Sequence, residues 1–148
     1  MPHFSPAALL ILLAGVLIAV QGPINAALGR AVGSPVNAAL LSFLVGSCAL
    51  ALVAVGQRVS PDSAAVRALP WWAWAGGLCG AMFVSAAAYA APRIGVATML
   101  TLAVASQLVT AVVLDHVGAF GAPKHPATVG RLAGLVLVFG GALLVRTK

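Results

Sequence analysis

The sequence predicts an all-α integral membrane protein with five transmembrane helices. Of its 148 residues, 62% are hydrophobic and 7% are charged, whereas about 25% of the residues in a soluble domain are charged. Mean hydropathy is +1.11. The apolar residues form five runs, and each is close to the roughly 20 helical residues that cross about 30 Å of hydrocarbon. These observations exclude a soluble enzyme, a disordered chain and a coiled coil.

We predict a single five-helix domain over residues 1–148. The predicted helices cover about residues 6–29, 35–56, 71–91, 94–114 and 127–146. Transmembrane strands are a poor alternative because barrel strands alternate polar and apolar residues, and these runs stay apolar. The first run lacks the basic start and the small-residue cleavage site of a signal peptide, so we expect it to be retained.

The connections contain the residues that typically end helices. Ser34 is expected to cap the second helix, with Pro35 at the first helical position. The longest and most polar connection is 57–70, while 92–95 is predicted to be a tight turn and 115–126 a loop rich in Gly and Pro.

The basic residues indicate a membrane topology rather than nucleic-acid binding. The net charge is +6, but the Lys and Arg residues lie singly between apolar runs. Five spans would put four of them on each side: Arg58, Arg67, Lys124 and Arg131 against Arg30, Arg93, Arg146 and Lys148. The positive-inside rule then selects no orientation. Either the helix ends are imprecise or the amino terminus decides, or copies insert in both orientations and pair antiparallel.

An antiparallel pair would supply the two inverted repeats between which many transporters bind substrate. Several helices carry small residues four positions apart, a spacing that lets helix backbones approach closely in lipid. The predicted packing residues are Ala38, Ser42, Gly46, Gly76, Gly80, Gly130 and Gly134.

Two amides in the first helix are candidate substrate-binding residues. Gln21 and Asn25 are four residues apart and therefore share a helix face. Gly22 and Pro23 lie between them, and we predict a helix break there, a kink or partial unwinding that exposes a carbonyl near Ala19.

Gln107, with Ser106 and Thr110, provides a matching polar group in the fourth predicted helix. Together the amides either line a substrate cavity or bond across helices, which is worth about 0.6 kcal/mol per bond on average.

The remaining ionisable groups form no recognisable catalytic or metal-binding constellation. Glu is absent and the two acidic residues are Asp62 and Asp115. The histidines lack metal-ligand spacing, so we expect no enzyme activity, cofactor or metal. Asp115 is expected either to cap the loop or to be paired with Arg93 or Lys124, or else to act as a gate or proton relay at the mouth of a dimer.

The order and spacing of these motifs resemble the five-helix, half-size YdcZ-like branch of the drug/metabolite transporter (DMT) superfamily. The matching residues are Gln21, Asn25, Gly33-Ser34-Pro35, Ala38, Gly46, Pro70-Trp71-Trp72, Gly76-Gly77, Gly80, Gly95, Gln107, Asp115, Gly118 and Gly121. The resemblance implies a multi-pass protein of the bacterial inner membrane that forms dual-topology homodimers, oppositely oriented pairs or fused ten-helix chains. The four-helix small multidrug transporters place a Glu in the first helix, where this chain has Gln21.

We therefore predict a small-molecule transporter that works as an antiparallel dimer in the lipid bilayer. Amides donate and accept hydrogen bonds but do not titrate, so an amide-lined central cavity suits a small neutral or zwitterionic solute. The expected partners are the bilayer, the solute and a second copy or a paired homologue. A passive channel and a non-transporting membrane scaffold or assembly protein are the alternatives. Substrate, transport direction and coupling ion stay open.

Overall fold

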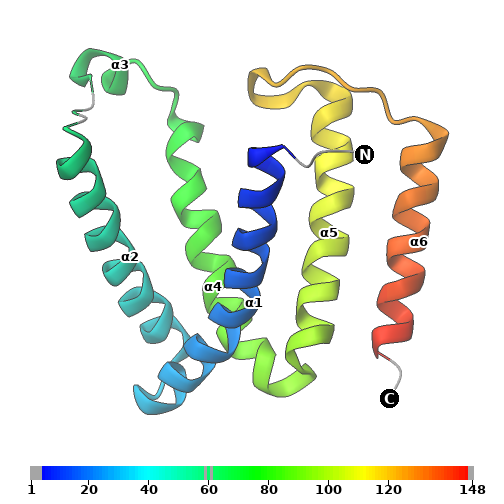
Figure 1. Cartoon of the computed structure of the whole chain (residues 1–148), viewed down its shortest axis with the longest axis horizontal. Helices are drawn as coiled ribbons and strands as arrows, with labels where there is room; N and C mark the ends of the chain where they lie inside the picture. The colour runs from blue at the N-terminus through cyan, green and yellow to red at the C-terminus, as the bar shows by residue number, and fades with distance from the viewer. Residues whose placement is uncertain (1–4, 59, 61, 147–148) are drawn as a thin grey trace. The chain divides into compact units, whose positions relative to one another are not determined.

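The computed structural model describes residues 5–58, 60 and 62–146, and its regular structure is helical (Figure 1). His3 and Lys148 lie outside the described residues, as does the side chain of Arg146. The elements in chain order are α1 (Pro6–Ala31), α2 (Pro35–Gln57), α3 (Ser63–Arg67), η1 (Trp71–Trp74), α4 (Ala75–Ile94), α5 (Val96–Val117), η2 (Ala119–Gly121) and α6 (Val129–Arg146). They form two compact units, Met1–Arg93 and Ile94–Lys148.

The first two helices begin at capped prolines. Ser5 accepts a hydrogen bond from the Ala8 amide, and Pro6 opens α1. The cap predicted for α2 is confirmed, because Ser34 Oγ accepts a hydrogen bond from the backbone N–H of Asn37 at 3.4 Å and Pro35 is the first helical residue. Proline suits this position because its missing N–H would have had no partner inside the helix.

Of the two forms predicted for the break at Gly22 and Pro23, a kink and a partial unwinding, the structure shows no unwinding. Helix α1 continues from Pro6 to Ala31 with Pro23 inside it, and Figure 1 shows one ribbon that bends in its second half. One proline removes one donor and crowds the carbonyl four residues earlier, here that of Ala19. The bonds on either side persist, so the helix bends without unwinding.

The predicted 57–70 connection contains a short helix. Asp62 caps α3 by accepting from the Ala64 amide at 2.9 Å. The tryptophans of η1 then lead into α4, which extends to Ile94 with Pro92 inside its last turn. The tight turn predicted over 92–95 is therefore shorter than expected and is formed by Gly95 at φ +82°.

The second unit is a hairpin of α5 and α6. Helix α5 ends at Gly118, whose φ of +67° is a left-handed conformation that favours glycine. The connection passes through η2 and an extended segment to α6 at Val129. A backbone bond from the His125 amide to the Asp115 carbonyl, at 2.9 Å, ties this segment back to the end of α5.

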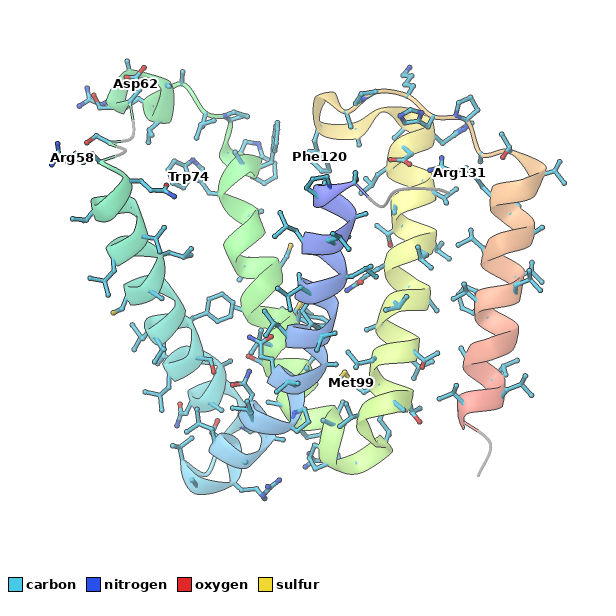
Figure 2. All side chains as sticks on the ribbon, in the orientation of Figure 1. Arg58, Asp62, Trp74, Met99, Phe120 and Arg131 are labelled. Carbon is cyan, nitrogen blue, oxygen red and sulfur yellow. The ribbon has the colours of Figure 1, made fainter. Side chains whose placement is uncertain are left out.

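The surface of the helices is apolar, as expected of segments in contact with lipid. Large side chains such as Val45 (71% exposed) and Leu137 (76% exposed) project from the helices, and Figure 2 shows side chains on all sides of the ribbon. Within the described part of the chain, four helices are long and apolar enough to cross a membrane: Pro6–Ala31, Pro35–Gln57, Trp71–Ile94 and Val96–Val117. Val129–Val145 forms a shorter apolar helix. The chain is therefore an all-helical, multi-pass membrane protein.

Candidate functional site

The candidate site is built on the close contact between α1 and α2. A Cβ atom added to Gly29 would lie 3.6 Å from Pro35 Cα and 3.7 Å from Ala38 Cβ, which is ordinary van der Waals contact. Ala38 is completely buried. Small residues on both helices therefore let the backbones approach, and this approach brings polar side chains of the two helices together.

Asn25 is the polar centre of this contact. It is 1% exposed, and its Oδ1 accepts a hydrogen bond from Ser42 Oγ. A buried amide without a partner would be strongly destabilising, so this bond explains how Asn25 is tolerated between the helices. The spacing of small residues predicts a packing role for Ser42 but does not reveal that its hydroxyl is a donor to Asn25. A hydroxyl within a ridge of otherwise small apolar residues was the available signal.

Gln21 lies one helical turn before Asn25 and has different surroundings. Its side chain is exposed in the single chain, and none of the hydrogen bonds found among the described residues involves it. Gln21 lines a groove of about 610 Å³ that it shares with Asn25 and Ser42. It also lines adjoining recesses of about 200 Å³ and 450 Å³. The unpartnered amide is therefore accessible from several directions.

The other walls of the 610 Å³ groove are mainly aliphatic. Leu17, Ile24, Leu41 and Val45 line it, while its polar groups come from Gln21, Asn25 and Ser42. Small-molecule sites combine apolar walls with a few placed polar groups that fix the orientation of the ligand. This groove can therefore accept a compact solute that has an apolar part and at least one hydrogen-bonding group.

The polar group on α5 belongs to the second unit. Ser106 Oγ donates to the Ala103 carbonyl at 2.8 Å, and Thr110 Oγ1 donates to the Ser106 carbonyl at 2.9 Å. Both hydroxyl protons are thus used within the helix, which leaves these oxygens as acceptors. The Gln107 side chain is exposed and takes part in no hydrogen bond found in the described part of the chain.

Asp115 forms an ion pair in the second unit, but with neither predicted partner. Its Oδ2 lies 2.5 Å from a guanidinium nitrogen of Arg131, at the start of α6 (Figure 2). The same guanidinium donates to the His125 carbonyl at 3.2 Å. The path of the 118–128 segment, which residue patterning did not reveal, returns α6 beside the end of α5 and brings Arg131 to Asp115.

The predicted packing residues fall into two groups. Ala38 and Ser42 contact α1, and a Cβ on Gly80 would lie 3.3 Å from Phe43 Cζ. A Cβ on Gly46, Gly76 or Gly134 would meet no atom within 4 Å, and one on Gly130 would only reach Thr128 Oγ1 at 4.0 Å. The second group is therefore open in the single chain.

Metal-ligating side chains are not grouped in the residues that the structure describes. No cluster of three or more His, Cys, Asp or Glu side chains among them could hold a metal ion. Cys48 and Cys79 are exposed free thiols.

The long apolar helices define the chain as a multi-pass membrane protein. The chain belongs to the family described as "Putative inner membrane exporter, YdcZ", whose model matches residues 6–144. The inner membrane protein YdcZ of Escherichia coli (strain K12) is 29% identical over 136 residues, which cover 91% of each chain. No solved structure matches the chain. The protein is thus a membrane transporter of the bacterial inner membrane.

Proposed function

We propose that this protein exports a small neutral or zwitterionic solute as an antiparallel homodimer whose central cavity includes Gln21 and Asn25. The observation that carries the proposal is the groove of about 610 Å³ between α1 and α2, with an unpartnered Gln21 amide at its wall. The family description as an exporter supports the direction of transport.

The energetics of Gln21 favour a cavity over a lipid-facing position. Moving an uncompensated amide from water into an apolar medium costs roughly 2–7 kcal/mol. This cost is avoided if the Gln21 amide faces water, a solute or a second protein chain. A second copy that covers the open side of the groove would convert it into a closed, amide-lined cavity.

We propose five membrane spans, the number on which the balance of basic residues between the two sides depends. The shortest apolar helix, Val129–Val145, would span about 26 Å at a rise of 1.5 Å per residue. This length is near the lower limit for crossing the hydrocarbon core and is accommodated by slight bilayer thinning. The balance of four basic residues on each side then leaves both orientations accessible.

Gln107 is proposed as a second amide of the cavity, with Ser106 and Thr110 as acceptors beside it. A gate or relay role for Asp115 requires its pair with Arg131 to open during transport, because that pair occupies the carboxylate in this structure. Among the described residues, no carboxylate lines the recesses around Gln21, so the proposed cavity recognises its solute by hydrogen bonding and shape.

Solute flux into proteoliposomes tests the transport proposal. The purified chain is first screened for thermal stabilisation by metabolites and drugs, since a ligand raises stability in proportion to ln(1 + [L]/Kd). Flux of each stabilising solute is then measured. Saturation and counterflow are expected of a carrier. Linear flux without exchange would identify a channel, and absence of both stabilisation and flux would favour a scaffold.

Single-cysteine labelling tests the antiparallel arrangement. In a Cys48→Ala/Cys79→Ala background, Ser60→Cys should be labelled from both sides of the membrane, and so should a cysteine appended at the C-terminus. Two lysines added to the 57–70 connection should shift the population to one orientation, because the positive-inside rule would then apply. Labelling of each site from one side only, before lysines are added, would contradict dual topology.

A further inference from the structure

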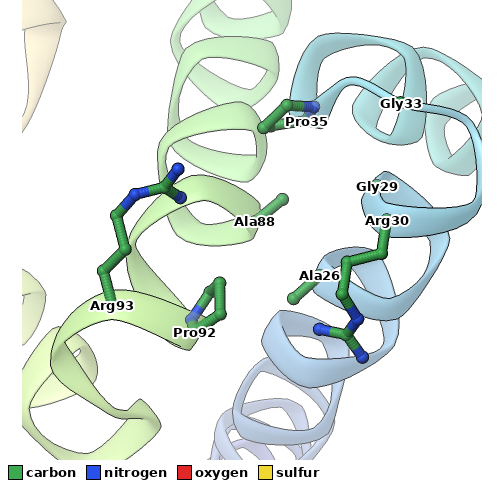
Figure 3. A pocket seen from close by; sticks show the side chains of 8 residues that line it. All are labelled: Ala26, Gly29, Arg30, Gly33, Pro35, Ala88, Pro92 and Arg93. Atoms are coloured by element: carbon green, nitrogen blue, oxygen red, sulfur yellow. The ribbon is translucent and has the colours of Figure 1, made fainter.

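A second pocket lies at the turn end of the first unit, and it shares no lining residue with the groove at Gln21. This pocket has a volume of about 240 Å³ and is lined by residues of α1, the α1–α2 turn, α2 and α4. Figure 3 shows Arg30 and Arg93 on opposite sides of it. The proposed transport function gives these arginines no role beyond membrane topology.

The pocket exists because its walls carry little side-chain volume. Ala26 and Ala88, which are 5% and 3% exposed, face the space together with Gly29. Pro35 and Pro92 complete the wall, and proline has no backbone N–H to offer a ligand. Hydrogen-bond donors for a ligand must therefore come mainly from the two arginines.

The two guanidinium groups differ in how firmly they are held. Arg93 donates to the Tyr89 carbonyl at 2.5 Å, and its Cζ lies 3.5 Å from the centroid of the Tyr89 ring. A guanidinium has five N–H donors, so most of those of Arg93 stay available. Arg30 is exposed and makes neither a hydrogen bond nor an ion pair with any described residue. One cation is thus positioned, and the other can adjust to a ligand.

The acidic side chains that the structure describes supply no counter-charge for this pair. The chain's two acidic residues are Asp62 and Asp115. Asp62 caps α3 through the Ala64 amide, and Asp115 is paired with Arg131. Neither carboxylate lines the pocket. Two cations beside one small cavity, without an internal anion, attract an anion from outside the chain.

We propose that the Arg30/Arg93 pocket binds a phosphate group. Guanidinium groups match phosphate oxygens with paired N–H donors. The volume is close to the liquid volume of about eight water molecules at roughly 30 Å³ each, which suits a phosphate with a few attached atoms. Both arginines follow long apolar segments of their helices, at the level of the headgroups. The phosphate comes either from an anionic lipid or from a soluble phosphate compound.

Thermal unfolding of the purified full-length chain in neutral detergent tests this site. One arm adds short-chain phosphatidylglycerol in mixed micelles, and another adds inorganic phosphate, each against chloride at matched ionic strength. We expect a saturable rise of the unfolding midpoint in at least one arm. Arg30→Gln should weaken the apparent affinity about tenfold, near the lower range for a charge-assisted hydrogen bond. Arg67→Gln, an exposed arginine on α3 outside the pocket, is the matched control.

A rise with lipid alone assigns a headgroup site, whereas a rise with inorganic phosphate assigns a site for a soluble phosphate compound. Arg93→Gln should weaken binding similarly. Arg93→Gln also removes the contact between Arg93 and Tyr89. If Arg93→Gln does not fold for this reason, the result with Arg30→Gln decides the test. The proposal is overturned if no arm saturates, or if Arg67→Gln reduces the affinity as much as Arg30→Gln. Either result would leave solute transport through the groove at Gln21 unaffected.

Discussion

Replacing Gln21 by Ala should remove solute binding and flux while leaving folding and dimerisation intact. Gln21 is exposed in the single chain and lines the 610 Å³ groove, so its truncation breaks no bond within the described chain and creates no cavity in a packed core. We expect the free energy of unfolding to change by no more than about 0.5 kcal/mol.

The expected loss of binding is larger. A ligand group left unpaired in a dry cavity costs about 1–3 kcal/mol, which corresponds to about a five- to more than a hundredfold rise in Kd. Asn25→Ala should behave differently, because it also removes the bond from Ser42. That interhelical bond is worth about 0.6 kcal/mol on average and at most about 1.7 kcal/mol, so Asn25→Ala should lower both stability and binding.

The assay combines unfolding in mixed micelles, cross-linking of the dimer, and solute flux in proteoliposomes for the same set of variants. Asn37→Ala is the matched control, since it removes an exposed amide that lines none of the recesses around Gln21. Gln107→Ala tests the proposed second amide by the same criteria. Misfolding or loss of the dimer in Gln21→Ala would make this amide structural. Flux equal to that of the unsubstituted chain would refute its assignment to the cavity.

Three other substitutions test the second unit. Asp115→Asn should lower the free energy of unfolding by about 1 kcal/mol or less, as for partly exposed ion pairs, and should preserve flux. Unfolding and flux are measured on the same preparation, and a loss of flux with intact folding would assign Asp115 as a gate. Gly118→Ala should destabilise the hairpin by about 1–2 kcal/mol because the φ of Gly118 is +67°. The added Cβ would also lie only 2.6 Å from Lys124 Cγ. An unchanged unfolding midpoint would contradict this prediction. Gly134→Leu should fold normally but weaken dimer cross-linking, since an added Cβ meets no atom within 4 Å in the single chain, and unchanged cross-linking would exclude this position from the interface.

Local chemistry made the start of α2 predictable. The Ser34 cap and the proline after it depend on neighbouring residues alone, and the structure reproduces both. The end of α4 was less predictable because a proline near the end of a helix can stop it or be absorbed in its last turn. Here Pro92 is absorbed, and the chain turns at Gly95.

Contacts between helices depend on their register, which hydrophobicity patterns leave undetermined. The pairing of Asn25 with Ser42 requires one alignment of α1 against α2, set by the close approach of Gly29 to Pro35 and Ala38. Likewise, Asp115 could be assigned a basic partner from charge alone, but the choice of Arg131 depends on the loop that leads into α6.

The register also separates two amides that the sequence presents as equivalent. Gln21 and Asn25 share a helix face, yet Ser42 is hydrogen-bonded to Asn25 and leaves Gln21 without a protein partner. An amide whose oxygen is already bonded inside a helix contact fixes the shape of the groove wall and has less capacity left for a solute. An unpartnered amide one turn away retains all its donors and acceptors. Recognition of a solute should therefore depend mainly on Gln21, while Asn25 and Ser42 hold α1 and α2 at the spacing that forms the groove.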